Sequence, residues 1–194
     1  MQLVERLVGA VSDLTTRQPR VLVGIDGPDA AGKNTLADRL AAATPGTVRR
    51  VSVDDFPQPV ERRYRRGELS PEGFYQDSID HDRLIAEVLV PFRSGTDGAA
   101  SAVLIVDGIF LLRPELAHLW DLSVHLTVPE HVVLTRAGAR NIGLYSSLAE
   151  LEHRYRTRYL PGQARYRADA DPEARADVLV DNTDPRRPRL LRSR

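Results

Sequence analysis

Cysteine is absent from this chain of 194 residues, and lysine occurs only once. The missing thiols exclude disulfides and thiolate metal sites. The formal net charge is +0, and no long basic run precedes the C-terminal segment, so the broad positive field of a protein that coats nucleic acid is missing too. We therefore expect no nucleic-acid partner, and a chemistry carried by carboxylates, arginine, histidine and the single lysine.

Long apolar runs are also missing. No segment approaches the roughly 20 residues that a membrane-spanning helix needs, and the N-terminus has no basic stretch followed by an apolar one. We expect a cytoplasmic protein without a membrane partner. Because no linker divides the chain, we predict a single domain over residues 1–185. The Arg-rich tail, residues 186–194, is predicted to be frayed and solvated.

The sequence does contain a glycine-rich loop, Gly27–Thr35, between an apolar run and a helical pattern. A strand, such a loop and a helix form the phosphate-binding loop of nucleotide-binding proteins, in which glycines permit a tight turn and backbone amides face the phosphate oxygens. ATP or GTP is therefore the predicted ligand. The residues expected to bind it are Gly27, Asp29, Ala30, Ala31, Gly32, Lys33, Asn34 and Thr35.

Lys33 is the only lysine in a chain that otherwise uses arginine for positive charge. A compact ammonium at this position is what a phosphate loop requires, and we expect Lys33 to reach the β- and γ-phosphates. The motif also calls for Ser or Thr next, because that hydroxyl binds Mg²⁺, but the residue is Asn34. Its amide oxygen can bind Mg²⁺. We expect weakened metal binding, or support of the metal by other residues.

Two further carboxylates follow apolar segments. Asp54 comes after the β-branched run 48–53, and Asp107 closes the apolar run 102–106 in the form of a Walker B strand. Ligands of open α/β sheets bind at the carboxyl ends of the strands. A carboxylate at such a strand end can hold magnesium, so Asn34 and Asp107 are the predicted metal ligands.

Apolar runs alternate with helical patterns along the chain, which predicts a parallel sheet with helices on both faces. Five strands are expected, over residues 21–25, 48–53, 102–106, 122–128 and 176–181. Helices are predicted over residues 2–16 and 77–92, after a capping box at residues 127–130, and from Ser147 to a stop at Pro161-Gly162. The irregular segment 57–75 reads equally well as a cover over the site or as a solvated loop.

The combination of motifs resembles the uridine kinase family of P-loop kinases, with phosphoribulokinase and bacterial pantothenate kinase as more distant relatives. The resemblance spans residues 20–182. It rests on the loop, Ser52–Phe56, Pro71–Phe74, Asp77–Asp80, Asp107-Gly-Ile and Arg158–Gln163, with Tyr155 six residues before Pro161. It implies a P-loop NTPase fold with a small helical lid.

In such a kinase, a carboxylate accepts the proton of a hydroxyl while cations surround the transferred phosphoryl group. The resemblance implies that Asp54 is this base, that Asp77 contacts ribose hydroxyls, and that Arg136 and Arg140 close over the phosphates. The acceptor-binding residues that it implies are Asp54, Phe56, Tyr75, Asp77, Arg158 and Gln163. We thus predict an ATP- or GTP-dependent, Mg²⁺-assisted kinase acting on a small-molecule hydroxyl, with a nucleoside-like acceptor favoured.

The chain departs from that family between residues 91 and 100. Nucleoside kinases of this kind grip the pyrimidine with Tyr and His on a hairpin there, and this segment has neither. Three alternatives therefore stay open: a kinase for a non-nucleoside alcohol, a nucleotide-binding protein with reduced or lost turnover, and an NTPase that acts on water or on a macromolecule. The oligomeric state, a homo-oligomer included, also stays open.

Overall fold

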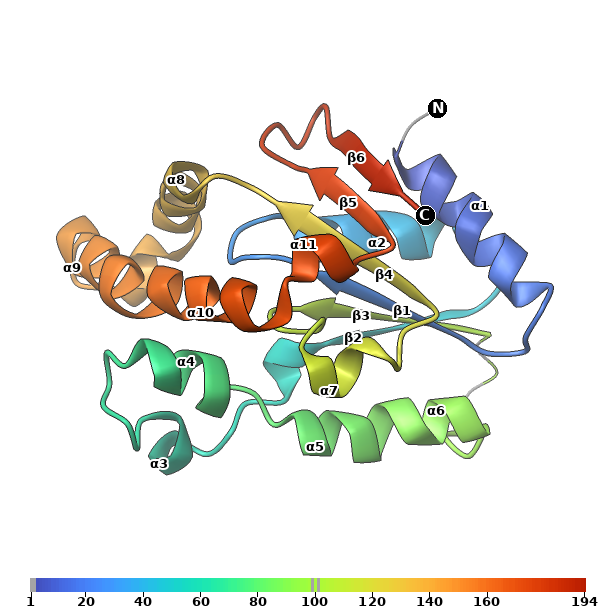
Figure 1. Cartoon of the computed structure of the whole chain (residues 1–194), viewed down its shortest axis with the longest axis horizontal. Helices are drawn as coiled ribbons and strands as arrows, with labels where there is room; N and C mark the ends of the chain where they lie inside the picture. The colour runs from blue at the N-terminus through green and yellow to red at the C-terminus, as the bar shows by residue number, and fades with distance from the viewer. Residues whose placement is uncertain (1–2, 99, 101) are drawn as a thin grey trace.

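The computed structural model describes residues 3–98, 100 and 102–194. Its centre is a six-stranded sheet in the order β2-β3-β1-β4-β5-β6. Every neighbouring pair from β2 to β5 is parallel, and β6 is antiparallel to β5 (Figure 1). The strands are β1 (Val21–Asp26), β2 (Val48–Ser52), β3 (Val103–Gly108), β4 (Leu122–Thr127), β5 (Val178–Asp181) and β6 (Arg189–Ser193).

Helices and helical turns connect the strands. The α-helices are α1 (Leu3–Thr15), α2 (Lys33–Ala43), α3 (Val60–Arg63), α4 (Pro71–Asp77), α5 (His81–Leu84), α6 (Val90–Ser94), α7 (Pro114–Ala117), α8 (Glu130–Asn141), α9 (Leu148–Arg154), α10 (Leu160–Ala170) and α11 (Pro172–Arg175). Residues 53–55 and 142–144 form 3₁₀ turns, and residues 85–89 and 155–159 form π turns. Across the described ranges, none of these helices is long and apolar enough to cross a membrane.

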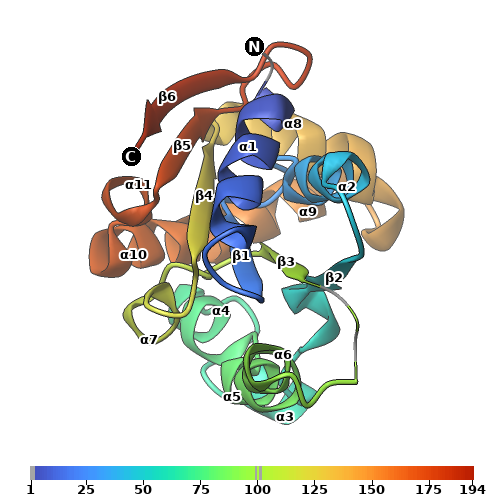
Figure 2. The ribbon, with the colours of Figure 1, turned by 90° about the vertical axis from the view of Figure 1, so that its right-hand side faces the viewer.

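The two faces of the sheet carry separate apolar cores, because successive side chains of a strand point to opposite faces. Val21, Val23 and Ile25 of β1 pack with α1 and α2, whereas Leu22 packs with the helices of the other face. Figure 2 shows α1 and α2 on one side of the sheet and α4, α7 and α10 on the other. A charged side chain buried at the end of a strand therefore packs against the core of one face of the sheet only.

The predicted helical lid is formed by α8 and α9, which extend beyond the carboxyl ends of the strands (Figure 1). It has a small apolar cluster of its own, comprising Val133, Ala137, Leu151, Tyr155 and Leu160. Ser147 begins α9 as predicted, since its Oγ accepts a hydrogen bond of 3.1 Å from the amide of Glu150. The α/β fold with helices on both faces is thus confirmed.

The number of strands was predicted wrongly, because the tail is part of the sheet. Residues 189–193 form β6, in which Leu190 faces Val180 of β5 and packs against the core on the α2 side. The side chain of Arg192 donates to the backbone carbonyls of Glu173 and Ala176. Every second residue of β6 is exposed, Arg189 among them, and charge on an edge strand discourages further pairing. The Arg-rich segment is therefore an edge strand rather than a frayed end.

Several helix boundaries also differ from the prediction. Pro161 does not end a helix, because the π turn Tyr155–Tyr159 widens the backbone ahead of it and α10 continues to Ala170. Pro91 follows a π turn in the same way. Thr127 does not cap α8, since its hydroxyl donates to Glu173 at 2.9 Å. The segment 57–75 contains α3 and the start of α4.

Candidate functional site

The glycine-rich loop leaves β1 and enters α2, which confirms the strand, loop and helix arrangement. Gly27 has φ 149° and Gly32 has φ 93°, in the region that favours glycine. A side chain on Gly27 would also meet the carbonyl oxygen of Leu126 at 2.6 Å. The two glycines thus let the loop turn tightly beside β4, and Gly32 places the N-terminus of α2 at the end of the loop.

Side chains from the lid and from the end of β5 hold the loop in this shape. Arg136 donates to the carbonyl of Ala30 at 3.2 Å and to that of Asn182 at 2.9 Å. The amide nitrogen of Asn182 donates to the carbonyl of Ala31 at 2.6 Å. The guanidinium of Arg136, expected to close over phosphates, is therefore bonded to backbone carbonyls beside the loop.

A cavity of about 110 Å³ lies at the start of α2. It is lined by Asp29, Ala30, Gly32, Lys33, Asn34, Thr35, Asp54, Asp107, Gly108, Ile109 and Arg140, and we call it the Lys33 cavity. The ammonium of Lys33 donates to the carbonyl of Pro28 at 2.8 Å. Most of the loop residues predicted to bind the nucleotide thus meet at one cavity with the predicted base, the predicted metal ligands and one lid arginine.

The charges of the Lys33 cavity are mixed. Desolvation raises the pKa of Asp29; Lys33 and Arg140 oppose this shift, and the nearby charge of Asp54 adds to it. Asp54 itself is exposed, and within the described part of the chain its carboxylate makes no hydrogen bond or ion pair. Two cationic side chains and an accessible carboxylate are the groups that phosphoryl transfer to a hydroxyl requires.

Asp107, the predicted Walker B carboxylate, is 1% exposed and is bound by the guanidinium of Arg50. Burial raises the pKa of Asp107, and the hydrogen bond from Arg50 opposes that shift. Asn34 lines the same cavity but supplies no hydroxyl. No group of three or more His, Cys, Asp or Glu side chains in the described ranges could hold a metal ion. The pairing of Asp107 with Arg50, and an amide at Asn34 where a hydroxyl is expected, do not match the magnesium site that the fold family implies.

The predicted acceptor residues other than Asp54 lie outside the Lys33 cavity. Asp77 is 1% exposed, and its two carboxylate oxygens bind Arg65 at 2.5 Å and Arg66 at 2.8 Å. These contacts hold the pKa of Asp77 below its ordinary value, although burial alone would raise it. Phe56 and Tyr75 are buried in the core on the α10 side of the sheet.

Arg158 lies in the π turn Tyr155–Tyr159, and Gln163 lies in α10, which follows it. Arg158 is 3% exposed and donates to backbone carbonyls, the shortest contact being 2.7 Å to Glu68. Gln163 is equally buried, and neither atom of its amide has a hydrogen-bond partner among the described residues. It lines a separate cavity of about 190 Å³ with Pro28 and His125. A contact of either residue with an acceptor stays a prediction.

The segment that lacks the Tyr and His of nucleoside kinases joins α6 to β3. Its described residues after α6, 95–98 and 100, form no strand, and residues 99 and 101 lie outside the description. Asp97 holds the segment to the molecule through ion pairs of 3.3 Å with Arg20 and 3.1 Å with Arg49.

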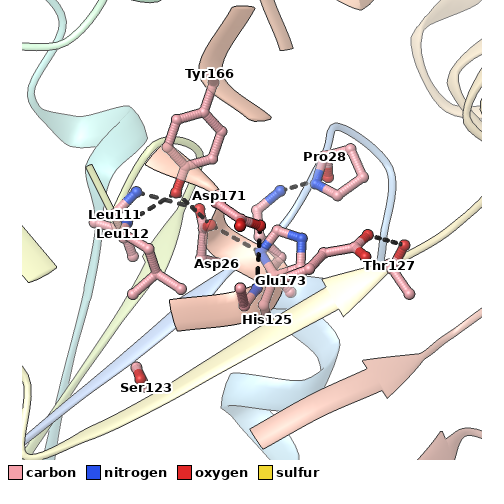
Figure 3. Close-up of polar contacts among 12 residues, drawn as sticks. Asp26, Pro28, Leu111, Leu112, Ser123, His125, Thr127, Tyr166, Asp171 and Glu173 are labelled. Atoms are coloured by element: carbon pink, nitrogen blue, oxygen red, sulfur yellow. Dashed lines mark hydrogen bonds and ion pairs between the residues drawn. The ribbon is translucent and has the colours of Figure 1, made fainter. Parts of the chain in front are cut away.

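A buried polar network beside the loop was not predicted. Asp26 is 0% exposed and accepts hydrogen bonds from the amide of Leu111 at 3.1 Å and from the hydroxyl of Tyr166 at 2.7 Å. The ring of His125 lies 2.9 Å from the same carboxylate (Figure 3). Burial would raise the pKa of Asp26, but these contacts hold it below its ordinary value. The sequence signal for this network was His125, a polar residue inside the apolar run 122–128.

The tail also contributes to a cavity that sequence reasoning missed. A cavity of about 340 Å³ adjoins the loop at Gly32 and Thr35 and is also lined by Asn182 and by the connection between β5 and β6, including Arg186 and Arg187. This cavity reaches from the start of α2, next to the phosphate loop, to the Arg-rich tail. Two basic residues of the tail, Arg186 and Arg187, thus line a cavity beside the predicted nucleotide site.

No model of a known protein family matches the chain. Uridine-cytidine kinase D of Dictyostelium discoideum is 27% identical over 153 residues, which cover 69% of this chain and 29% of that longer protein. A possible uridine kinase from Bacillus stearothermophilus has a similar structure, with a TM-score of 0.65 and 21% identity over 90% of this chain and 98% of that one. The structure of a proposed fructose transport system kinase from Silicibacter sp. is also similar. Its TM-score is 0.69, with 22% identity over 88% of this chain and 96% of that one.

The two solved structures share the fold of this chain, and the Dictyostelium protein adds a likeness in sequence. The relatives carry kinase names of more than one kind. The predicted resemblance is thereby confirmed: the chain has the α/β fold of P-loop kinases and is similar in sequence to a uridine-cytidine kinase.

Proposed function

We propose that this chain is a small-molecule kinase that transfers the γ-phosphoryl group of a nucleoside triphosphate, ATP or GTP, to a hydroxyl group. The observation that carries the proposal is the Lys33 cavity, in which a phosphate loop, two cationic side chains and the accessible carboxylate of Asp54 meet. Kinase names among the relatives support the same reaction class.

Each group of the cavity has a role that its chemistry allows. The loop amides and Lys33 bind the phosphates, and Arg140 adds positive charge on the lid side. Asp54 accepts the proton of the acceptor hydroxyl as oxygen attacks the γ-phosphorus, and the bond from that phosphorus to the bridging oxygen breaks. Arg136 positions the loop through the carbonyl of Ala30.

A nucleoside-like acceptor is the favoured class, because the likeness in sequence is to a uridine-cytidine kinase. Two observations keep a non-nucleoside alcohol as the alternative. The segment between α6 and β3 lacks the Tyr and His that would grip a pyrimidine, and the Asp77 carboxylate is already bound by two arginines. Recognition of a buried polar group depends on such hydrogen bonds.

The test is phosphoryl transfer from ATP or GTP to a panel of nucleosides, sugars and other alcohols, detected by the mass of the phosphorylated product. With an acceptor in hand, Asp54→Asn should lower turnover about 10²- to 10⁴-fold, because the proton acceptor is lost. Asp55→Asn is the matched control, since Asp55 is also exposed but does not line the Lys33 cavity.

Full turnover by Asp54→Asn would contradict the proposed role of this residue. The second candidate function, nucleotide binding without turnover, is favoured by the pairing of Asp107 with Arg50 and by Asn34. Tight binding of ATP with no product from any member of the panel would support that alternative and contradict the kinase.

A further inference from the structure

Arg50 lies between two carboxylates at the edge of the Lys33 cavity. One nitrogen of its guanidinium binds the buried Asp107 and the other binds Asp38 on α2. The two carboxylates differ in their surroundings, because the side chain of Asp107 is 1% exposed and that of Asp38 is 71% exposed. The guanidinium thus connects the buried end of the cavity to the outer surface of α2.

The register of the sheet explains why this arginine reaches Asp107. Ser52 of β2 is level with Asp107 of β3, and Arg50 precedes Ser52 by two residues and so points to the same face. That face is covered by α2, since Ile105, two residues before Asp107, packs with α2. Arg49 points to the opposite face and pairs with Asp97 at 3.1 Å.

The guanidinium of Arg50 therefore binds the Asp107 carboxylate, which a divalent cation would need as a ligand. A guanidinium satisfies a carboxylate through directed N–H donors and carries a permanent positive charge, so it repels a second cation at the same oxygens. The position after Lys33, where a hydroxyl would be the other protein ligand, is Asn34. Both protein contacts expected for magnesium are thus altered in this chain.

We propose that Arg50 is the resident cation of the Asp107 carboxylate, and that the nucleotide binds at the Lys33 cavity with little dependence on a divalent cation. The inference rests on the proposed nucleotide binding. Arg50 acts as a positioning residue: it neutralises Asp107, which would otherwise repel the triphosphate, and fixes the charge of the cavity by ion pairs on two elements, β2 and α2.

The test compares the dissociation constant of ATP in EDTA with that in excess MgCl₂, by calorimetry on the full chain. For the wild type, the ratio of the two constants should be about threefold or less, because coupling between the nucleotide and the cation is weak. In Arg50→Gln, Asp107 becomes available to Mg²⁺ and the ratio should rise to about tenfold or more. Arg49→Gln, on the other face of β2, should behave as the wild type.

A wild-type ratio of about tenfold or more that Arg50→Gln leaves unchanged would overturn the inference. If Arg50→Gln does not fold, the wild-type ratio decides by itself. A ratio of about threefold or less supports the inference, and a ratio of about tenfold or more overturns it.

Failure of the proposed function is distinguishable from failure of this inference. If no variant binds ATP or GTP under any condition, the kinase proposal fails, and Mn²⁺ alone becomes the probe. Arg50→Gln should then bind Mn²⁺ at least about fivefold more tightly than the wild type and Arg49→Gln. Equal Mn²⁺ affinities in the three proteins would overturn the role of Arg50.

Discussion

Asp26 and Asp54 both lie at the carboxyl edge of the sheet, yet their surroundings are opposite. Asp26 ends β1, is 0% exposed and contacts Leu111, His125 and Tyr166. Asp54 follows β2, is exposed, and its carboxylate has no partner in the part of the chain that the structure describes. A buried charge must be satisfied within the protein, whereas an accessible one can bind a ligand.

This difference in surroundings indicates a structural role for Asp26 and a catalytic role for Asp54. The contacts of Asp26 connect β1, β4, α10 and the loop after β3, so its charge holds four segments together beneath the phosphate loop (Figure 3). Asp54 and Lys33 line a cavity instead. Replacing residues of the first region should change stability, and replacing residues of the second should change turnover.

After Asp54→Asn, the largest effect is expected at Lys33. Lys33→Gln should lower phosphoryl transfer about 10²- to 10³-fold, because a cation that stabilises charge on the transferred group is lost. The melting temperature should change little, since among the described residues the ammonium makes one hydrogen bond, to the Pro28 carbonyl. Turnover is measured with the acceptor found in the panel, and unfolding by circular dichroism. Turnover close to that of the wild type would show that the cavity is not the phosphate site.

The phosphate loop, the strand ends and the parallel sheet could be predicted because they depend on local pattern. Glycines at Gly27 and Gly32 satisfy a backbone requirement, and β-branched runs ending in a carboxylate mark the functional edge of the sheet. Lys33, Asp54 and Asp107 accordingly lie at one cavity, as the positions of their segments predicted. These features follow from a few neighbouring residues each.

Features that depend on contacts between distant segments could not be predicted. The ion pair of Arg50 with Asp107 joins residues 57 positions apart, and the hydrogen bond of Tyr166 with Asp26 spans 140. The strand β6 was missed because an arginine-rich segment resembles a solvated tail until the pairing of Leu190 with β5 is known. Pro161 looked like a helix stop because a π turn leaves no local signature.

The next effect in size is expected at Asp26. Asp26→Asn should lower the free energy of unfolding by about 2–4 kcal/mol at neutral pH, because a buried carboxylate loses the contacts that its charge strengthens. The measurement is chemical denaturation of both proteins. Asp54→Asn is the matched control, since the carboxylate of Asp54 is exposed and its loss should leave unfolding unchanged. Equal stability of Asp26→Asn and the wild type would contradict the structural role.

The pH dependence of this difference has a definite sign. Because the pKa of Asp26 in the folded chain lies below its ordinary value of 3.8, the unfolded chain takes up the proton first on acidification. The stability from Asp26 is therefore present in full above that value and is lost as the pH falls through the folded pKa. The gap between the wild type and Asp26→Asn should narrow only in that acidic window, and a gap that narrows near neutral pH would contradict this assignment.

The smallest effect is expected at Tyr166, whose hydroxyl donates to Asp26 at 2.7 Å and accepts from the amide of Leu112 at 2.9 Å. Tyr166→Phe keeps the ring, which packs edge-on against Phe110, and removes both hydrogen bonds. The free energy of unfolding should fall by about 1–2 kcal/mol, less than for Asp26→Asn, because His125 and Leu111 still contact the carboxylate. Turnover should stay within about twofold, since Tyr166 does not line the Lys33 cavity. A large loss of turnover at unchanged stability would instead show that the buried network of Asp26 takes part in catalysis. The assignment of a structural role to Asp26 and a catalytic role to Asp54 would then be wrong.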